Sequence, residues 1–210
     1  MATHGRYLVT PAASSTPAPL LVGFHGYGEH ADRHLAQLTQ IPGSHRWTRV
    51  AIQGLHRFYS QSRKHIVASW MTRQNRDLAI ADNLQYVNTV LDTVKASHQT
   101  NGTLIFCGFS QGVAMAYRAA TCGHHKAQAI MALAGDIPPE LKVKAHLDWP
   151  AVLVGRGDKD DWYTSDKLNQ DFEFLQSINV SVQSLTFSGG HEWTEEFRSK
   201  AGKFLSLHDQ

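Results

Sequence analysis

The residues whose types and spacing point most clearly to catalysis form the pentapeptide Gly108-Phe109-Ser110-Gln111-Gly112, a G-x-S-x-G pattern. An apolar run, residues 103–107, precedes it, and an alanine-rich stretch follows it. A strand, this pattern and a helix in that order make the sharp turn that exposes a nucleophilic serine. A Cβ at either glycine would collide with the neighbouring chain in such a turn. The spacing therefore predicts that Ser110 is a nucleophile held in a strained backbone conformation.

A serine hydroxyl becomes reactive only when a base removes its proton and an acid holds that base in one tautomer. In open α/β sheets such groups gather beyond the carboxyl ends of the strands. His191 is the candidate base, because it follows two glycines at the end of an apolar run. The candidate acids follow the run Ala151–Val154 and are Asp158, Asp160 and Asp161. The order serine, aspartate, histidine fits one of the known orders of a catalytic triad.

A developing oxyanion needs hydrogen-bond donors that already point at it. One expected donor is the backbone N–H of Gln111, the residue after the nucleophile. The second is expected from the glycine-rich loop His25-Gly26-Tyr27-Gly28, where the N–H of Tyr27 is the candidate. His25 is expected to brace this turn rather than to take part in the chemistry.

Short apolar runs alternate with amphipathic stretches, which is typical of βα units on a mainly parallel sheet with helices on both faces. The expected strands are Arg6–Thr10, Leu20–Phe24, Arg49–Ile52, Thr103–Cys107, Ala127–Leu133, Ala151–Val154 and Val180–Thr186. One helix is expected to begin at Ala31 and another directly after Ser110. Two more are expected at Asp77–Val94 and Ser165–Ile178, the first with the apolar stripe Ile80, Leu84, Val87, Leu91 and Val94. A last helix is expected to carry Trp193, Phe197, Phe204 and Leu205.

Bulk composition narrows the class of protein. A chain of 210 residues with 42% apolar residues fits a single domain over residues 1–210. A net charge of +2 does not indicate a nucleic acid or an anionic membrane as partner. The expected location is the cytoplasm, because we find neither an apolar run long enough for a bilayer nor a secretory leader pattern. The spacing of the thirteen histidines does not match a metal site, and no cofactor is expected.

The motifs His25-Gly-x-Gly, Gly108-Phe-Ser-Gln-Gly, Gly157-x-x-Asp160 and Gly189-Gly-His-Glu-Trp, in this order, resemble those of the phospholipase/carboxylesterase family of α/β-hydrolases. The resemblance runs from about Leu20 to Leu205 and implies the α/β-hydrolase fold. It also implies that Asp160 is the triad acid, with Asp158 in the turn.

The pocket is less defined by the sequence. Residues 134–150 leave no room for a sizeable helical lid, so an open site for small or flexible esters is expected. Segment Arg57–Arg76 is expected to be a long loop that forms one wall of the pocket. The resemblance places Trp70 near the site, although Trp70 could equally anchor the loop on the core. Further candidate lining residues are Asp136, Ile137 and Trp162.

The expected function is that of a carboxylesterase that cleaves small or short-to-medium-chain esters without a cofactor. The partner is a small-molecule ester, and the sequence indicates no oligomeric state. A lysophospholipase or an acyl-thioesterase would use the same residues. In family members that act on acyl-protein thioesters, His-Gly typically precedes the acid and Val-Pro follows it, whereas this chain has Arg156-Gly157 and Trp162-Tyr163. A non-catalytic binding protein on the same fold is the alternative from another class.

Overall fold

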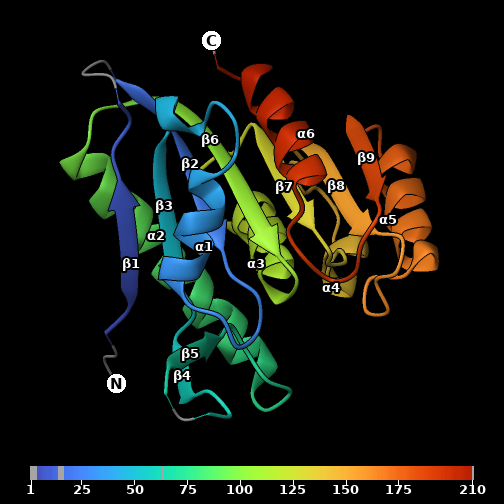
Figure 1. The fold of residues 1–210 in the computed structure, drawn as a ribbon, viewed down its shortest axis with the longest axis horizontal. Helices are drawn as coiled ribbons and strands as arrows, with labels where there is room; N and C mark the ends of the chain where they lie inside the picture. Colours follow the sequence, from blue (N-terminus) through green and yellow to red (C-terminus); the bar gives the residue numbers. More distant parts are fainter. Residues whose placement is uncertain (1–3, 14–16, 63, 210) are drawn as a thin grey trace.

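A seven-stranded sheet forms the centre of the computed structural model, which describes residues 4–13, 17–62 and 64–209. The strand order is β1-β3-β2-β6-β7-β8-β9 (Figure 1). The pair β1 and β3 is antiparallel, and the remaining pairs in this sheet are parallel. The strands are β1 (Arg6–Thr10), β2 (Ala18–Phe24), β3 (Thr48–Gln53), β6 (Thr100–Phe109), β7 (Ala129–Leu133), β8 (Ala151–Gly157) and β9 (Val182–Phe187).

Helices cover both faces of the sheet. Buried side chains of α2, α3, α4 and α5 pack on one face, and those of α1 and α6 pack on the other; Figure 1 shows α1 and α6 in front of the sheet. The arrangement confirms the predicted mainly parallel sheet between two helical layers. The helices are α1 (Ala31–Thr39), the 3-10 turn η1 (Ser44–Arg46), α2 (Arg76–Ser97), α3 (Gln111–Cys122), α4 (Pro139–Lys142), α5 (Ser165–Ser177) and α6 (Glu195–Ser206).

Strand β6 shows why the buried part of its sequence, residues 104–109, lacks polar side chains. Leu104 and Phe106 belong to the core on one face, whereas Ile105 and Cys107 belong to the core on the other. Successive side chains of a strand point to opposite faces, so a strand between two helical layers needs apolar residues at every position. The same run that carries Ser110 at its end therefore fixes that residue to the rigid centre of the protein.

The predicted apolar stripe of α2 is correct at Val87, Leu91 and Val94 but shifted by one position in the first half of the helix. We expected Ile80 and Leu84 on the buried stripe, but both are half-buried, and Ala79 and Asn83 are buried instead. Asn83 is tolerated there because its side-chain Nδ2 donates to the backbone oxygen of Trp70 at 2.7 Å. A polar side chain with a buried hydrogen-bond partner can occupy a position that pattern rules assign to an apolar residue.

The segment predicted as one long loop, Arg57–Arg76, contains a hairpin and the start of α2, which corrects that prediction. Strands β4 (His56–Tyr59) and β5 (Ile66–Ser69) pair antiparallel as a separate two-stranded sheet. The sequence did not indicate β4 because its residues are exposed or half-buried and lack an apolar face. This hairpin matters for the site, because β5 contacts the loop after β2.

Little chain covers the carboxyl ends of the strands between β7 and β8. The only helix that the structure shows within residues 134–150 is the single turn α4, which agrees with the expectation that no sizeable lid is inserted here. Across the described residues, no helix combines the length and the apolar character needed to cross a bilayer.

Candidate active site

Ser110 lies at a sharp turn between β6 and α3. Its backbone has φ 53° and ψ −121°, in a region that L-residues seldom adopt. The turn is possible because the flanking glycines allow close approach: a Cβ at Gly108 would lie 2.5 Å from the Cα of Val113, and one at Gly112 would lie 2.0 Å from the backbone oxygen of Phe24. The predicted strained strand-to-helix turn is therefore present.

His191 lies in the loop between β9 and α6 and bridges Ser110 and Asp160. Its Nε2 is 2.7 Å from Ser110 Oγ, and its Nδ1 is 2.9 Å from Asp160 Oδ2. A carboxylate oxygen only accepts, so the network assigns the ring proton to Nδ1 and leaves the Nε2 lone pair facing the serine hydroxyl. This is the tautomer in which the imidazole can take a proton from Ser110.

Of the three candidate acids, the structure brings Asp160 to His191. Its side chain is fully buried, and its Oδ1 accepts from the N–H groups of Trp162 and Tyr163, each at 2.9 Å. Asp158 Oδ1 instead accepts from the N–H of Gly189 at 3.0 Å, which links the two loops. Asp161 is exposed. The backbone donors compensate the buried charge of Asp160 and fix the direction of its second oxygen.

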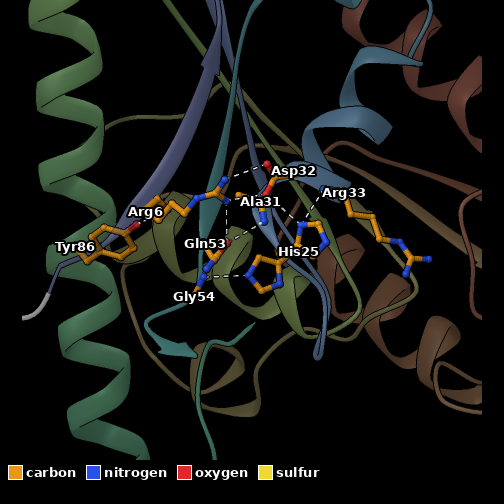
Figure 2. Close-up of polar contacts among 9 residues, drawn as sticks. Arg6, His25, Ala31, Asp32, Arg33, Gln53, Gly54 and Tyr86 are labelled. Atoms are coloured by element: carbon orange, nitrogen blue, oxygen red, sulfur yellow. Dashed lines mark hydrogen bonds and ion pairs between the residues drawn. The ribbon is translucent and has the colours of Figure 1, made fainter. Parts of the chain in front are cut away.

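The loop after β2 presents the N–H of Tyr27 through a hydrogen-bonded turn. His25 Nδ1 is 2.7 Å from the backbone oxygen of Gly26, and His25 Nε2 accepts from the N–H of Gly54 at 3.0 Å; Figure 2 shows the latter contact. The ring therefore donates from Nδ1 to the Gly26 carbonyl. In a trans peptide the C=O and the following N–H point in opposite directions, so holding this carbonyl sets the direction of the Tyr27 N–H.

The second expected donor, the N–H of Gln111, belongs to the first residue of α3 and so has no intrahelical partner. The side chain of Gln111 has a role that the sequence did not indicate. Its Oε1 accepts from the N–H of Trp70 and its Nε2 donates to the backbone oxygen of Met71, both at 2.9 Å. Gln111 thereby ties the chain after β5 to the turn that carries Ser110.

A polar network fixes the start of α1, directly after the Tyr27 loop (Figure 2). Arg6 Nη1 and Nη2 contact the carboxylate of Asp32 at 2.7 and 3.0 Å, and Arg6 Nη1 also donates to Gln53 Oε1 at 3.1 Å. Gln53 Oε1 in turn accepts from the N–H of Ala31 at 3.4 Å. The hydrogen bond from Arg6 is the main reason that the pKa of Asp32 falls to about 2. The edge strand β1, β3 and α1 are thus held together beside the loop.

Two buried histidines lie in or beside this loop. Burial lowers the pKa of His25 to about 4 and that of His34 to about 3. An unfolded chain with an ordinary histidine pKa of about 6.5 binds more protons than the folded chain as the pH falls below that value. The free energy of unfolding should therefore decrease from about pH 6.5 downwards, by roughly 2 kcal/mol per histidine between pH 7 and pH 5.

Urea unfolding at pH 7 and pH 5 tests this effect. In the variant His34→Leu, the loss of unfolding free energy between the two pH values should be smaller than in the wild type by roughly 2 kcal/mol. His65→Gln, at an exposed position, serves as the control and should keep the wild-type loss. Equal losses in His34→Leu and the wild type would contradict the assignment.

A cavity of about 340 Å³ lies beside Ser110 and His191. Its other lining residues include Tyr27, Glu29, Arg33, Gln37, Phe109 and Trp193. Glu29, Arg33 and Gln37 were missed by the sequence analysis. The signal that could have found them was their spacing of four: Arg33 and Gln37 share one face of α1, and Glu29 lies four residues before Arg33, just ahead of the helix.

The four residues proposed as possible pocket lining lie outside this cavity. For Trp70, the structure agrees with the alternative that it anchors the loop on the core. Trp70 is fully buried, and its Nε1 donates to the backbone oxygen of His25 at 2.9 Å, so it supports the loop from within the core. Ile137 is buried in the core, and Asp136 is exposed with its Oδ2 3.6 Å from Lys167 Nζ. Trp162 is 75% exposed. The sequence pattern indicates that these residues lie near the strand ends in sequence, but it does not indicate whether their side chains point towards the cavity.

The described residues contain no group of three His, Cys, Asp or Glu side chains that could hold a metal ion. Within the part of the chain that the structure describes, the one acidic partner of His125 is Asp92, which is too few ligands for a metal ion. His125 pairs with Asp92 through its Nε2 at 3.1 Å and contacts Lys95 Nζ through its Nδ1 at 3.0 Å.

The sheet is mainly parallel, and Ser110 lies at a strand-to-helix turn. Asp160 and His191 follow it in the sequence, and His191 contacts both Ser110 and Asp160. These features define the class of α/β-hydrolases. The family model of the phospholipase/carboxylesterase family matches residues 6–209, so the chain belongs to this family. It is therefore a carboxylic ester hydrolase by family. A search of curated proteins finds no match.

Solved structures with the same fold support the class. The chain is similar to the esterase PE8, with a TM-score of 0.78 and 23% identity over 98% of this chain and 100% of that one. It is similar to the Bacillus cereus carboxylesterase, with a TM-score of 0.77 and 14% identity over 97% and 94% of the two chains. Acyl-protein thioesterase 2 from Zea mays has a TM-score of 0.73 and 20% identity over 99% and 100%. At these identities the likeness shows the fold.

Proposed function

We propose that the protein is a serine carboxylesterase that cleaves small or short-to-medium-chain carboxylic esters through Ser110, His191 and Asp160. The observation that carries the proposal is the continuous contact from Ser110 Oγ to His191 Nε2 at 2.7 Å and from His191 Nδ1 to Asp160 Oδ2 at 2.9 Å. Each group has the partner that its role requires: a base for the nucleophile, and a buried carboxylate for the base.

The reaction has two halves. Ser110 Oγ attacks the ester carbonyl while His191 Nε2 takes the hydroxyl proton, and the N–H groups of Tyr27 and Gln111 stabilise the negative oxygen that forms. His191 then gives its proton to the leaving alkoxide, which departs as the alcohol and leaves an acyl group on Ser110. His191 then takes a proton from water, which attacks the acyl carbonyl of this acyl-enzyme. As the bond to Ser110 Oγ breaks, His191 returns the proton to Oγ, and the carboxylic acid and the free serine are released.

The dimensions of the site favour small esters. A cavity of about 340 Å³ lies at the lower end of the range of about 300–1,000 Å³ for small-molecule sites. The lining includes charged and amide side chains from α1, namely Arg33 and Gln37, which do not provide the continuous apolar surface that a long acyl chain would bury. We therefore place the optimum among short acyl groups.

Chain-length profiling tests this preference. We expect kcat/KM to be highest for p-nitrophenyl acetate or butyrate and to fall for octanoate and longer esters. Thioesters and lysophospholipids of matched acyl length serve as comparisons. A preference for long-chain lysophospholipids or acyl-thioesters would instead support the alternative activities, which use the same three residues.

Labelling with a fluorophosphonate tests the nucleophile and separates an enzyme from a binding protein on the same fold. We expect one adduct per chain, located on the peptide that contains Ser110. A folded protein that takes up no label would favour the non-catalytic alternative, and an adduct on another serine would contradict the assignment.

A further inference from the structure

We propose that Glu29 is a positioning residue whose carboxylate holds the turn Gly26–Glu29 in the conformation that presents the Tyr27 N–H to Ser110. The inference rests on the proposed function, since it concerns the stabilisation of the oxyanion formed on attack by Ser110. Glu29 is a candidate because it is a largely buried carboxylate that lines the cavity beside Ser110 and His191, and its polar partners are Gly26 and Arg33.

Glu29 holds both polar backbone atoms of Gly26. The N–H of Glu29 donates to the Gly26 oxygen at 3.2 Å, which closes a four-residue turn with Tyr27 and Gly28 in its centre. Glu29 Oε2 accepts from the Gly26 N–H at 2.9 Å. Gly28 has φ 71°, as required at the third position of a type II turn. The side chain and the backbone of Glu29 therefore hold the N–H and the oxygen of Gly26, respectively.

The same residue anchors the turn to its surroundings. The backbone N–H of Gly28 donates to the backbone oxygen of Ala68 at 3.0 Å, and the N–H of Ala68 donates to the backbone oxygen of Glu29 at 2.8 Å. The turn therefore pairs with β5. Arg33 Nε lies 3.1 Å from Glu29 Oε1. Each carboxylate oxygen thus has a donor, which compensates a negative charge placed near the position where the oxyanion develops.

Loss of the carboxylate would leave the N–H of buried Gly26 without its partner. A buried donor in that state is unfavourable, and the turn can relieve it only by rotating the Gly26 backbone or admitting water. Either change moves the adjacent peptide that carries the Tyr27 N–H. Because the oxyanion forms only in the transition state, the expected effect is on kcat rather than on KM.

Kinetics of Glu29→Ala, Glu29→Gln and the wild type on p-nitrophenyl butyrate test the inference. We expect Glu29→Ala to lower kcat roughly 10–100-fold, in keeping with the partial loss of one oxyanion donor, with KM within about threefold. Glu29→Gln keeps an oxygen that can accept from the Gly26 N–H, so its kcat should return to within about fivefold of the wild type. Glu173→Ala, an exposed carboxylate on α5, is the matched control and should behave as the wild type.

The outcomes separate this inference from the proposed function. Unchanged kcat in Glu29→Ala, or equal losses in Glu29→Ala and Glu29→Gln, would overturn the positioning role while an active wild type upholds the esterase. A folded wild type that neither turns over the ester nor reacts with a fluorophosphonate would overturn both. If Glu29 acted only through its negative charge, Glu29→Gln would lose as much kcat as Glu29→Ala. Recovery of kcat in Glu29→Gln is therefore the result that supports a role through the hydrogen bond to Gly26.

Discussion

Ser110→Ala is expected to lower kcat for p-nitrophenyl butyrate by roughly 10⁶-fold, the size of loss found when the nucleophile of a triad is removed. The change deletes only Oγ, so no acyl-enzyme can form, while the cavity and the donors of the oxyanion site remain. A small rate above that of water should persist for this reason. The backbone of residue 110 is already held by the neighbouring chain, since its N–H donates to the Leu133 oxygen at 2.9 Å.

Initial rates and thermal unfolding of the same sample measure this effect. The melting temperature should stay within a few degrees of the wild type, because one hydroxyl is lost from a half-buried position. Ser199→Ala, an exposed serine on α6, is the control and should keep wild-type kcat. Substantial turnover by a folded Ser110→Ala protein would show that another group performs the attack.

Asp160→Asn is expected to lower kcat by roughly 10⁴-fold through a change of tautomer. Oδ1 of Asp160 accepts from the N–H groups of Trp162 and Tyr163, so an asparagine would keep its oxygen there and turn its NH₂ group towards His191 Nδ1. That nitrogen would then have to accept, and the ring proton would move to Nε2. His191 could no longer take a proton from Ser110.

The neighbouring aspartates provide matched controls for this variant. Asp158→Asn retains an oxygen that can accept from the Gly189 N–H, and Asp161 is exposed, so Asp158→Asn and Asp161→Asn should each lose less than about tenfold. Values of kcat/KM for the three variants rank the aspartates directly. A larger loss in Asp158→Asn or Asp161→Asn than in Asp160→Asn would refute the assigned acid.

The sequence predicts best where chemistry constrains it on several levels at once. The buried part of β6 must be apolar on both faces, the glycines around Ser110 must permit close backbone contact, and His191 must follow a strand end on a glycine-containing turn. Together these requirements produce a sequence pattern that can be recognised in a single chain without an alignment. The antiparallel edge strand β1 was predicted with its observed bounds, because a short apolar run before a proline-rich segment has few other interpretations.

The remaining features depend on directions that no pattern encodes. Trp70 has the residue type of a pocket wall, but its ring points into the core, where Nε1 finds the His25 oxygen. Hairpin β4–β5 was missed because its strands are short and lack a buried alternating face. Glu29 carries no motif in the sequence, and only the folded turn shows its contact with Gly26. The partner of Trp70 is distant in the sequence, whereas that of Glu29 is local and depends on the conformation of the turn.

Trapping the acyl-enzyme tests the central claim most directly. Rapid acid quenching during turnover of p-nitrophenyl butyrate, followed by peptide mass analysis, should show one butyryl group on the peptide that contains Ser110. The Glu29→Ala variant should accumulate this adduct more slowly than the wild type, and Ser110→Ala should give none. A butyryl group on any other residue, or turnover that leaves Ser110 unmodified at every quench time, would contradict the proposed mechanism.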